Sequence, residues 1–490
     1  MLATLARSPR YKWYAFGTIA VGTFASVADQ GSVGVALPSI ATHFTTDIPS
    51  VQWVAIGFAM TIIALLLPVG RLADLIGLKK VYIAGSVVLV LGAVAAGLSD
   101  NLPLLVLSRA IQGSGAAMTQ GTGMAIIIAV FPPGERGKAI GLIMTMVGAG
   151  AIAGPAVGGL LVDSLGWRSV FFANVPLVAT GVVLGLAVLA SRPEDQGHPA
   201  NRRGGFDWLG ASLSSLALLI FLIAITYVHR IGWLSPPILA AAVSFPVLLV
   251  TFIWWEVRCP SPMLDLGFFR RRTFSLGVSA AFLTFLGSSA VLFMTPFYLQ
   301  SVLGYSPRVA GLVVVPGAIC VTLLGPLSGR LSDRYGWRIL TVGGLGLAVC
   351  GLSLLTRITE DSSLLLVIPA LVLQSCGMGV FYSPNSSSVL SSVGREHYGV
   401  VSGFLNLVRN AGNVTSIAVA TAIVTATMGS SGYEPSLDAV RDGTDIGVKL
   451  VFTVGLKYAY ITMAGSLLLA MAISAFKVSR SGPLPETAGI

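Results

Sequence analysis

Apolar residues fall in long runs along the whole chain, separated by short segments that contain polar, charged, Gly or Pro residues. Each run has about 20 residues, which is the length that a helix needs to cross about 30 Å of hydrocarbon. The pattern predicts helices at 13–38, 51–70, 81–99, 103–130, 138–162, 169–190, 209–228, 237–255, 274–300, 309–329, 338–356, 364–392, 398–427 and 452–476. The expected fold is an all-α integral membrane protein with fourteen transmembrane helices.

The charge content excludes most soluble classes of protein. Of 490 residues, 30 are Lys or Arg and 20 are Asp or Glu, so 10% are charged, against about a quarter in soluble domains. A soluble enzyme, a nucleic-acid binder and a secreted disulfide scaffold are therefore excluded. No GxxxxGK[ST] phosphate loop occurs, so no nucleotide is expected to bind. We expect no enzymatic activity, cofactor or nucleic-acid partner.

The cysteines and histidines do not suggest a metal site. None of the four Cys residues forms a CxxC pair, and the four His residues stand in or beside loops without a neighbouring ligand set. The Lys and Arg residues gather in alternate loops. With the amino terminus inside, this bias follows the positive-inside rule. We therefore predict a multi-pass protein of the cell membrane with both termini in the cytoplasm and the lipid bilayer as its surroundings.

An internal repeat organises the predicted helices. Residues 70–80 read GRLADLIGLKK and residues 329–338 read GRLSDRYGWR, so Gly, Arg, Leu, Asp and Gly recur at the same spacing. If both segments join the second and third helices of a six-helix unit, the chain divides into a half at 1–192, linkers with two additional helices at 193–272, and a half at 273–490. Parallel halves of this kind are one repeat architecture of secondary transporters.

These features together resemble the major facilitator superfamily and, within it, the fourteen-span drug/proton antiporter family. The resemblance covers almost the full chain. The motifs that carry it are 70–80, 329–338, Arg109 to Ala116 in the fourth span, Gly154 to Gly159 in the fifth, and Asp29 to Pro38 in the first.

The first span carries a carboxylate deep in the membrane. Ser26, Asp29 and Ser32 recur every three residues and share one helix face, which we expect to line water, so both serines are also candidates for the substrate path. A charge at this depth usually has a function, and Asp29 could take up or release a proton as its surroundings change. The alternative is a structural carboxylate that is permanently paired to Arg109.

Arg109 and Gln112 lie at i and i+3 in the fourth span, at a depth compatible with an ion pair or a shared water between Arg109 and Asp29. The resemblance implies a role in proton transfer for Arg109. We therefore group Asp29, Arg109 and Gln112 as the proton-coupling residues. A purely structural arginine that binds carbonyl groups is the alternative.

The thirteenth span has a polar stripe that we assign to the substrate path, with a buried structural network as the alternative. Its members, at alternating steps of four and three, are Ser402, Asn406, Arg409, Asn413 and Ser416. Weaker candidates for the same path are Gln374 and Asn385 in the twelfth span and Tyr298 and Gln300 in the ninth.

Small residues mark one side of the fifth span. Gly150, Gly154 and Gly158 recur every four residues beside Pro155, so another helix can approach closely. The resemblance implies that this sequence is typical of exporters, whereas tight packing alone is the alternative.

The repeated segments carry candidate residues for a conformational gate. We expect their charges to hold the two halves together on the cytoplasmic side and to stabilise an outward-open state; the alternative is that they only set the topology. Leu75 and Leu78 stand where a basic residue is common in the family, so we expect the first copy to be the weaker gate. The gate residues are Gly70, Asp74, Gly77 and Lys79 in the first copy and Asp333, Arg334 and Arg338 in the second.

The sequence therefore favours a secondary transporter, namely a proton-coupled exporter of hydrophobic or amphipathic small molecules by alternating access. With few membrane carboxylates, neutral, zwitterionic or anionic compounds fit better than dications. An exporter or flippase of lipid or lipid-linked molecules is the alternative. A non-transporting receptor or scaffold and a channel fit the polar stripes less well.

Overall fold

The computed structural model of the protein describes residues 10–46, 48–189, 206–232, 235–305, 307–433, 440 and 446–476. Within these residues the predicted fourteen long helices are all present, together with the short helix α3 (Ile48–Val51). Their bounds are α2 (Tyr11–His43), α4 (Trp53–Ile76), α5 (Leu78–Gly97), α6 (Leu102–Val130), α7 (Arg136–Leu165), α8 (Arg168–Val188), α9 (Trp208–Ile231), α10 (Pro236–Arg258), α11 (Arg272–Ser301), α12 (Pro307–Tyr335), α13 (Trp337–Leu355), α14 (Leu364–Leu390), α15 (Tyr398–Ser430) and α17 (Ile446–Ala475).

Twelve of these helices are long and apolar enough to cross a membrane by length and composition. The two others, α2 and α6, have lower hydropathy because they carry the polar side chains of the candidate site, among them Asp29 and Arg109. Transmembrane helices tolerate such groups where they face protein rather than lipid.

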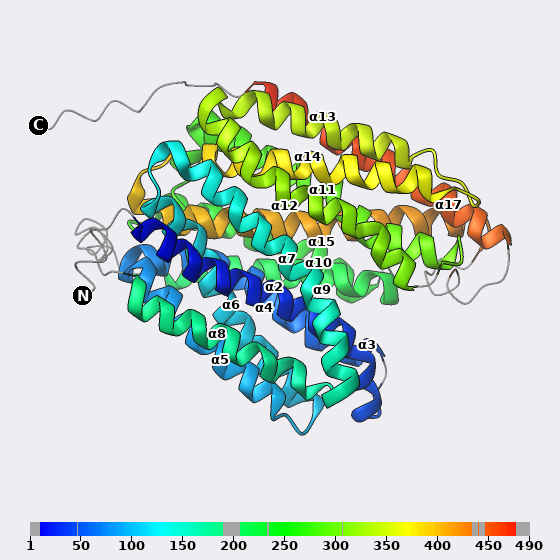
Figure 1. Ribbon diagram of the computed structural model, residues 1–490, viewed down its shortest axis with the longest axis horizontal. Coiled ribbons are helices and arrows are strands. Elements are labelled where there is room, and N and C mark those ends of the chain that lie inside the picture. Colours follow the sequence, from blue (N-terminus) through cyan, green and yellow to red (C-terminus); the bar gives the residue numbers. More distant parts are fainter. Residues whose placement is uncertain are drawn as a thin grey trace, which may run out of the picture.

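The helices form two groups that lie side by side in Figure 1, with blue to blue-green helices such as α2, α5 and α8 below and yellow to red helices such as α14 and α17 above. The groups meet where α7 packs on α12 and α14, and where α15 packs on α4 and α6. The additional helices α9 and α10 pack on each other, and α9 also contacts α4 and α15. These contacts support the division at 1–192, 193–272 and 273–490, which we retain as a proposal.

The packing of α5 on α6 is repeated by α13 on α14. A Cβ atom on Gly92 would lie 2.6 Å from the backbone nitrogen of Gln112, and one on Gly351 would lie 2.5 Å from that of Gln374. Neither helix pair leaves room for a side chain there, which is how small residues permit close helix contact. Gln112 and Gln374 thus occupy corresponding positions.

The repeated segments at 70–80 and 329–338 are not loops, contrary to the sequence prediction. α4 continues to Ile76 and α5 begins at Leu78, so Gly77 alone joins them, with φ of 104°. Gly336 joins α12 to α13 in the same way, with φ of 84°. The apolar run shows only where the helix leaves the hydrocarbon layer. The helix itself continues beyond this point and ends at a glycine, which can adopt positive φ.

Candidate functional site

Asp29 is the acceptor at the centre of a buried polar cluster. Arg109 Nη1 lies 2.7 Å from Asp29 Oδ2, which makes an ion pair between α6 and α2. Asp29 Oδ1 accepts hydrogen bonds from Gln112 Nε2 at 3.2 Å and from Asn174 Nδ2 at 2.9 Å. The three predicted coupling residues are therefore in direct contact, and both carboxylate oxygens are occupied.

Arg109 is held by further contacts besides the carboxylate. Its Nε donates to the carbonyl oxygen of Val54 at 3.1 Å, and its Nη1 donates to Gln112 Oε1 at 2.6 Å. The guanidinium carbon lies 4.1 Å from the centre of the Phe58 ring, within the range of a cation–π contact. Four helices of the first half, α2, α4, α6 and α8, thus fix one ion pair.

Asn174 was missed by the sequence analysis. It is the one member of the cluster that α8 supplies, and its side chain is buried. The signal that could have revealed it is a single amide in the otherwise apolar 169–190 run, because a lone polar group in a membrane helix needs a partner.

The cluster is buried in this conformation. Asp29 is 3% exposed and Arg109 is 1% exposed, and Ser26 and Ser32 are buried as well. The expectation that this helix face lines water is therefore wrong for this conformation. The reason is that α7 covers it: Ser32 Oγ donates to the carbonyl oxygen of Gly154 at 2.7 Å.

The glycines of α7 allow this close approach. A Cβ atom on Gly154 would lie 2.5 Å from the carbonyl oxygen of Ala28, and atoms added to Gly150 and Gly158 would meet the backbone of α2 at 2.9 Å and 2.6 Å. Pro155 lies against Gly31 in the same contact. The small residues of α7 thus seal the helix that carries Asp29.

A hydrogen-bonded chain leads from the neighbourhood of Asp29 into the other half. Gln120 on α6 donates to Ser26 Oγ at 3.4 Å, and its own carbonyl oxygen accepts from Asn406 Nδ2 at 3.2 Å. Asn406 therefore connects the polar stripe of α15 to the helix that carries Arg109.

The remainder of the α15 stripe faces α11. Ser289 Oγ donates to Asn413 Oδ1, and Ser416 Oγ accepts from the backbone nitrogen of Ala290. Arg409 lies between Asn406 and Asn413 on the stripe and is partly exposed. The structure thus brings these residues together where α15 meets α6 and α11.

The weaker candidates for the substrate path lie apart from this place. Gln374 is buried between α14 and α13, and Asn385 Nδ2 donates to the carbonyl oxygen of Gly277 at 3.1 Å. The Tyr298 hydroxyl donates to the carbonyl oxygen of Thr359, whereas Gln300 is exposed near the end of α11.

The gate aspartates bind helix starts rather than basic side chains. Asp74 accepts from the backbone nitrogens of Gly399 at 2.8 Å and Val400 at 2.9 Å, in the first turn of α15. Gly70 lies against the same segment, since a Cβ atom there would be 2.8 Å from the carbonyl oxygen of Gly399. A carboxylate at a helix N-terminus pairs with unsatisfied amides and with the helix dipole.

The second copy makes the reciprocal contact. Asp333 on α12 accepts from the backbone nitrogens of Gly137 at 3.3 Å and Lys138 at 3.4 Å, at the start of α7. Its bonds are longer than those of Asp74, and Asp333 is the less buried. This geometry is opposite to the expectation of a weaker first gate. Asp74 binds backbone amides, so the presence of Leu75 in place of a basic residue does not weaken its contact.

The predicted basic gate residues make no ion pair with these aspartates among the described residues. Arg334 and Arg338 are exposed, and Arg334 lies over the Tyr335 ring. The basic contact between the halves comes instead from Arg136, whose guanidinium carbon lies 5.7 Å from the centre of the Tyr398 ring.

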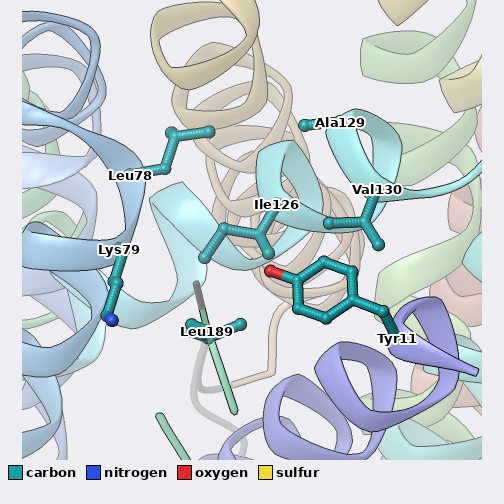
Figure 2. Close-up of a pocket in the computed structure, with 7 residues that line it drawn as sticks. All are labelled: Tyr11, Leu78, Lys79, Ile126, Ala129, Val130 and Leu189. Atoms are coloured by element: carbon teal, nitrogen blue, oxygen red, sulfur yellow. The ribbon is translucent and has the colours of Figure 1, made fainter. Parts of the chain in front are cut away.

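Lys79 lines a small hollow at the predicted cytoplasmic end of α2, α5 and α6, beside Tyr11 and Leu189 (Figure 2). Its volume is about 20 Å³, which is enough for about one water molecule. The hollow is therefore too small to hold a transported compound.

Hydrogen bonds between the two halves gather at one end of the molecule. Within the described residues they join Asp74 to Gly399 and Val400, Asp333 to Gly137 and Lys138, Ser383 to Gly137, Thr145 to Thr322, and Asn406 to Gln120. All belong to the predicted cytoplasmic halves of α7 and α15. The structure is thus closed at that end.

Two helix groups that close against each other at one end, the first of which holds a buried ion pair, have the arrangement of a secondary transporter. Residues 19–417 match the Major Facilitator Superfamily, so the chain belongs to this superfamily. Its members are transporters and not enzymes, which confirms the resemblance seen in the sequence.

Relatives of the chain include transporters and resistance proteins. It is 32% identical over 424 residues to the multidrug resistance protein Stp of Mycobacterium tuberculosis, covering 86% of this chain and 78% of that protein. It is 30% identical over 401 residues to the riboflavin transporter RibZ of Clostridioides difficile, covering 82% and 86%. It is 26% identical over 455 residues to the lincomycin resistance protein LmrB of Listeria monocytogenes, covering 92% and 95%.

Solved structures share the fold. The human organic anion transporter MFSD10 superposes with a TM-score of 0.62 at 17% identity, covering 96% of this chain and 100% of that one. The proton:xylose symporter XylE superposes with a TM-score of 0.63 at 13% identity, covering 94% of each chain. At these identities the likeness shows the fold alone.

Proposed function

We propose that the protein is a proton-coupled exporter of hydrophobic or amphipathic small molecules, located in the cell membrane with both termini in the cytoplasm. The observation that carries the proposal is the Asp29–Arg109 ion pair, which is buried between two membrane helices, α2 and α6. A buried charge pair is weak evidence for stability, since well-packed apolar residues would often serve as well. Its presence therefore supports a functional role.

In this proposal, binding of a proton to Asp29 and binding of a compound between the halves disfavour each other. Protonation removes the charge that pairs with Arg109, so the guanidinium is released from its carboxylate. The chain through Ser26, Gln120 and Asn406 supplies a route by which this change reaches α15. Opening of the sealed α2–α7 contact would give Asp29 its access to water.

The outward direction is supported by two considerations. The gate contacts of Asp74 and Asp333 close the predicted cytoplasmic end, so in this conformation a bound compound could leave only on the opposite side. The names of Stp and LmrB describe resistance, which export of a toxic compound would provide.

The lipid alternative receives less support from the arrangement of the extra helices. α9 contacts both α4 and α15, and Ser215 of α9 donates to the carbonyl oxygen of Ala64 at 2.8 Å. α9 therefore covers the seam between the halves where α4 meets α15, instead of leaving that side open to lipid.

The test is Asp29→Asn in proteoliposomes with an imposed pH gradient. Riboflavin and lincomycin serve as probes, and a pH-sensitive dye reports proton movement. We expect gradient-driven flux to be lost in Asp29→Asn and retained in Asp100→Asn, which removes an exposed carboxylate beyond α5. Flux at the wild-type rate in a correctly inserted Asp29→Asn protein would exclude the proton-coupling role.

A further inference from the structure

Arg409 places a positive charge midway through the membrane. It lies about three turns from the start of α15 at Tyr398, or about 16 Å along the helix axis. Asn406, one turn before it, bonds to α6, and Asn413, one turn after it, bonds to α11. Because the three share a helix face, Arg409 projects into the region that α6 and α11 border.

This guanidinium has no counterion in the described part of the chain. None of the described side chains forms an ion pair, a hydrogen bond or a ring contact with Arg409, whereas Arg109 makes all three kinds of contact. Asp29 lies deep in the first half, and both its oxygens are occupied there. A charged side chain within the membrane usually faces a partner or a water-filled cavity. Arg409 is partly exposed, so its guanidinium is open to water or to a bound molecule.

A second donor lies beside it. The Oδ1 atom of Asn413 is taken by Ser289, which leaves the two N–H groups of the Asn413 amide without an acceptor among the described residues. Guanidinium and amide N–H groups on adjacent turns form a donor set that suits oxygen anions.

Apolar surface adjoins these donors. Gly412, three residues after Arg409, packs against Phe285, since a Cβ atom there would lie 2.8 Å from the Cβ of Phe285. The Phe285 ring in turn packs edge-on against Tyr382, with ring centres 5.8 Å apart. A compound held by its anionic end at Arg409 would therefore have the half-buried Tyr382 and the buried Phe285 as apolar neighbours.

We propose that Arg409 and Asn413 form a binding site for the acidic group of a substrate, so that organic anions with an apolar body are the preferred substrates. This assignment rests on the proposed transport function and names its substrate class. The acidic group is a carboxylate, sulfonate or phosphate, because each offers oxygen atoms that accept from both side chains.

The test uses three probes with one ring system and different charge: dansylglycine (anion), dansylglycinamide (neutral) and dansylethylenediamine (cation). Binding to the full-length protein in nanodiscs is measured by equilibrium dialysis, with empty nanodiscs subtracted. We expect about tenfold tighter binding of dansylglycine than of the other two, since a charge-assisted pair is involved. Arg409→Gln should remove this preference, and Arg409→Lys should retain most of it.

The matched control is Arg357→Gln, which removes the same charge from the segment between α13 and α14 and should leave the preference unchanged. Equal binding of the three probes, no binding of dansylglycine, or a preference that survives Arg409→Gln would each overturn the assignment. Because no gradient is applied, the result is independent of coupling: loss of the anion preference leaves the Asp29→Asn experiment intact, and the reverse also holds.

Discussion

The two halves of the molecule repeat the same packing but differ in what they bury. In the first half, Gln112 lies over Gly92 and, three residues before it, Arg109 pairs with Asp29. In the second, Gln374 lies over Gly351, and the residue three before it is the buried Leu371. The apolar version shows that the architecture needs no charge at this position. The packing therefore does not require the ion pair of the first half, which supports the proposed coupling role.

The largest expected effect is on the free energy of unfolding, when Arg109 is replaced by Leu, the residue at the corresponding position of the second half. Arg109→Leu leaves the Asp29 carboxylate buried without its cation, which should lower the free energy of unfolding by about 3–5 kcal/mol. Adding Asp29→Asn should recover most of this loss. Thermal unfolding in detergent measures both variants, with Arg357→Leu as the control. An unchanged Arg109→Leu protein would show that Asp29 carries no charge at rest.

The next effect compares the two gates. Asp74→Asn and Asp333→Asn each weaken a carboxylate–helix contact that contributes about 1–2 kcal/mol. Asp74→Asn should open the predicted cytoplasmic end more, because its bonds are shorter and more buried. Spin labels on cysteines at the exposed Lys80 and Arg338 positions report the opening by pulsed EPR. Equal distances in both variants would mean that the two gates are equivalent.

A smaller effect, on gradient-driven flux, should distinguish Gln112 from Gln374, which occupy corresponding positions in the two halves. Gln112→Ala removes a donor to Asp29 and should reduce gradient-driven flux by about tenfold, since a hydrogen bond to a charged group contributes about 1.5–3 kcal/mol. Gln374→Ala removes a buried amide that has no carboxylate beside it, so coupled flux should stay near the wild-type rate. The ratio of proton to probe flux in proteoliposomes decides between them. Matching losses in both variants would point to packing alone.

The smallest effect concerns pH at the first gate. Burial lowers the pKa of His397, and the nearby Arg71 and Arg271 act in the same direction, whereas Glu396 and Asp265 oppose them. Because the pKa of the half-buried His397 is lowered, the closed state is fully stable above the ordinary pKa of about 6.5 and loses stability as the pH falls below it. The spin-label distance should therefore increase slightly between pH 7.5 and pH 5.5. His397→Gln should flatten this change, and an identical slope in that variant would contradict it.

Much of the site could be predicted from the sequence because membrane burial makes polar residues conspicuous. The depths of Asp29 and Arg109 in their apolar runs gave a pairing that the structure realises as a direct ion pair. Helix spacing also grouped Asn406, Arg409 and Asn413 on one face. These features depend on the position of a residue along and around its helix, which can be derived from the spacing of residues in the sequence.

What the sequence could not reveal depends on contacts between helices. Asp74 and Asp333 bind backbone amides, which every residue except Pro carries, so no residue type marks the partner. The burial of the Asp29 face results from α7 lying on α2, and no sequence pattern within α2 indicates this contact. Asn174 was overlooked because a lone amide has no periodicity.

The gate contacts cross over, since each half contributes one carboxylate and one helix start. Asp74 of the first half holds α15 of the second, and Asp333 of the second holds α7 of the first. A single rotation of one half against the other must break both carboxylate–helix contacts together, because loss of one contact strains the other. Inward opening should therefore be a cooperative, all-or-none event, with few half-open molecules through which protons could leak.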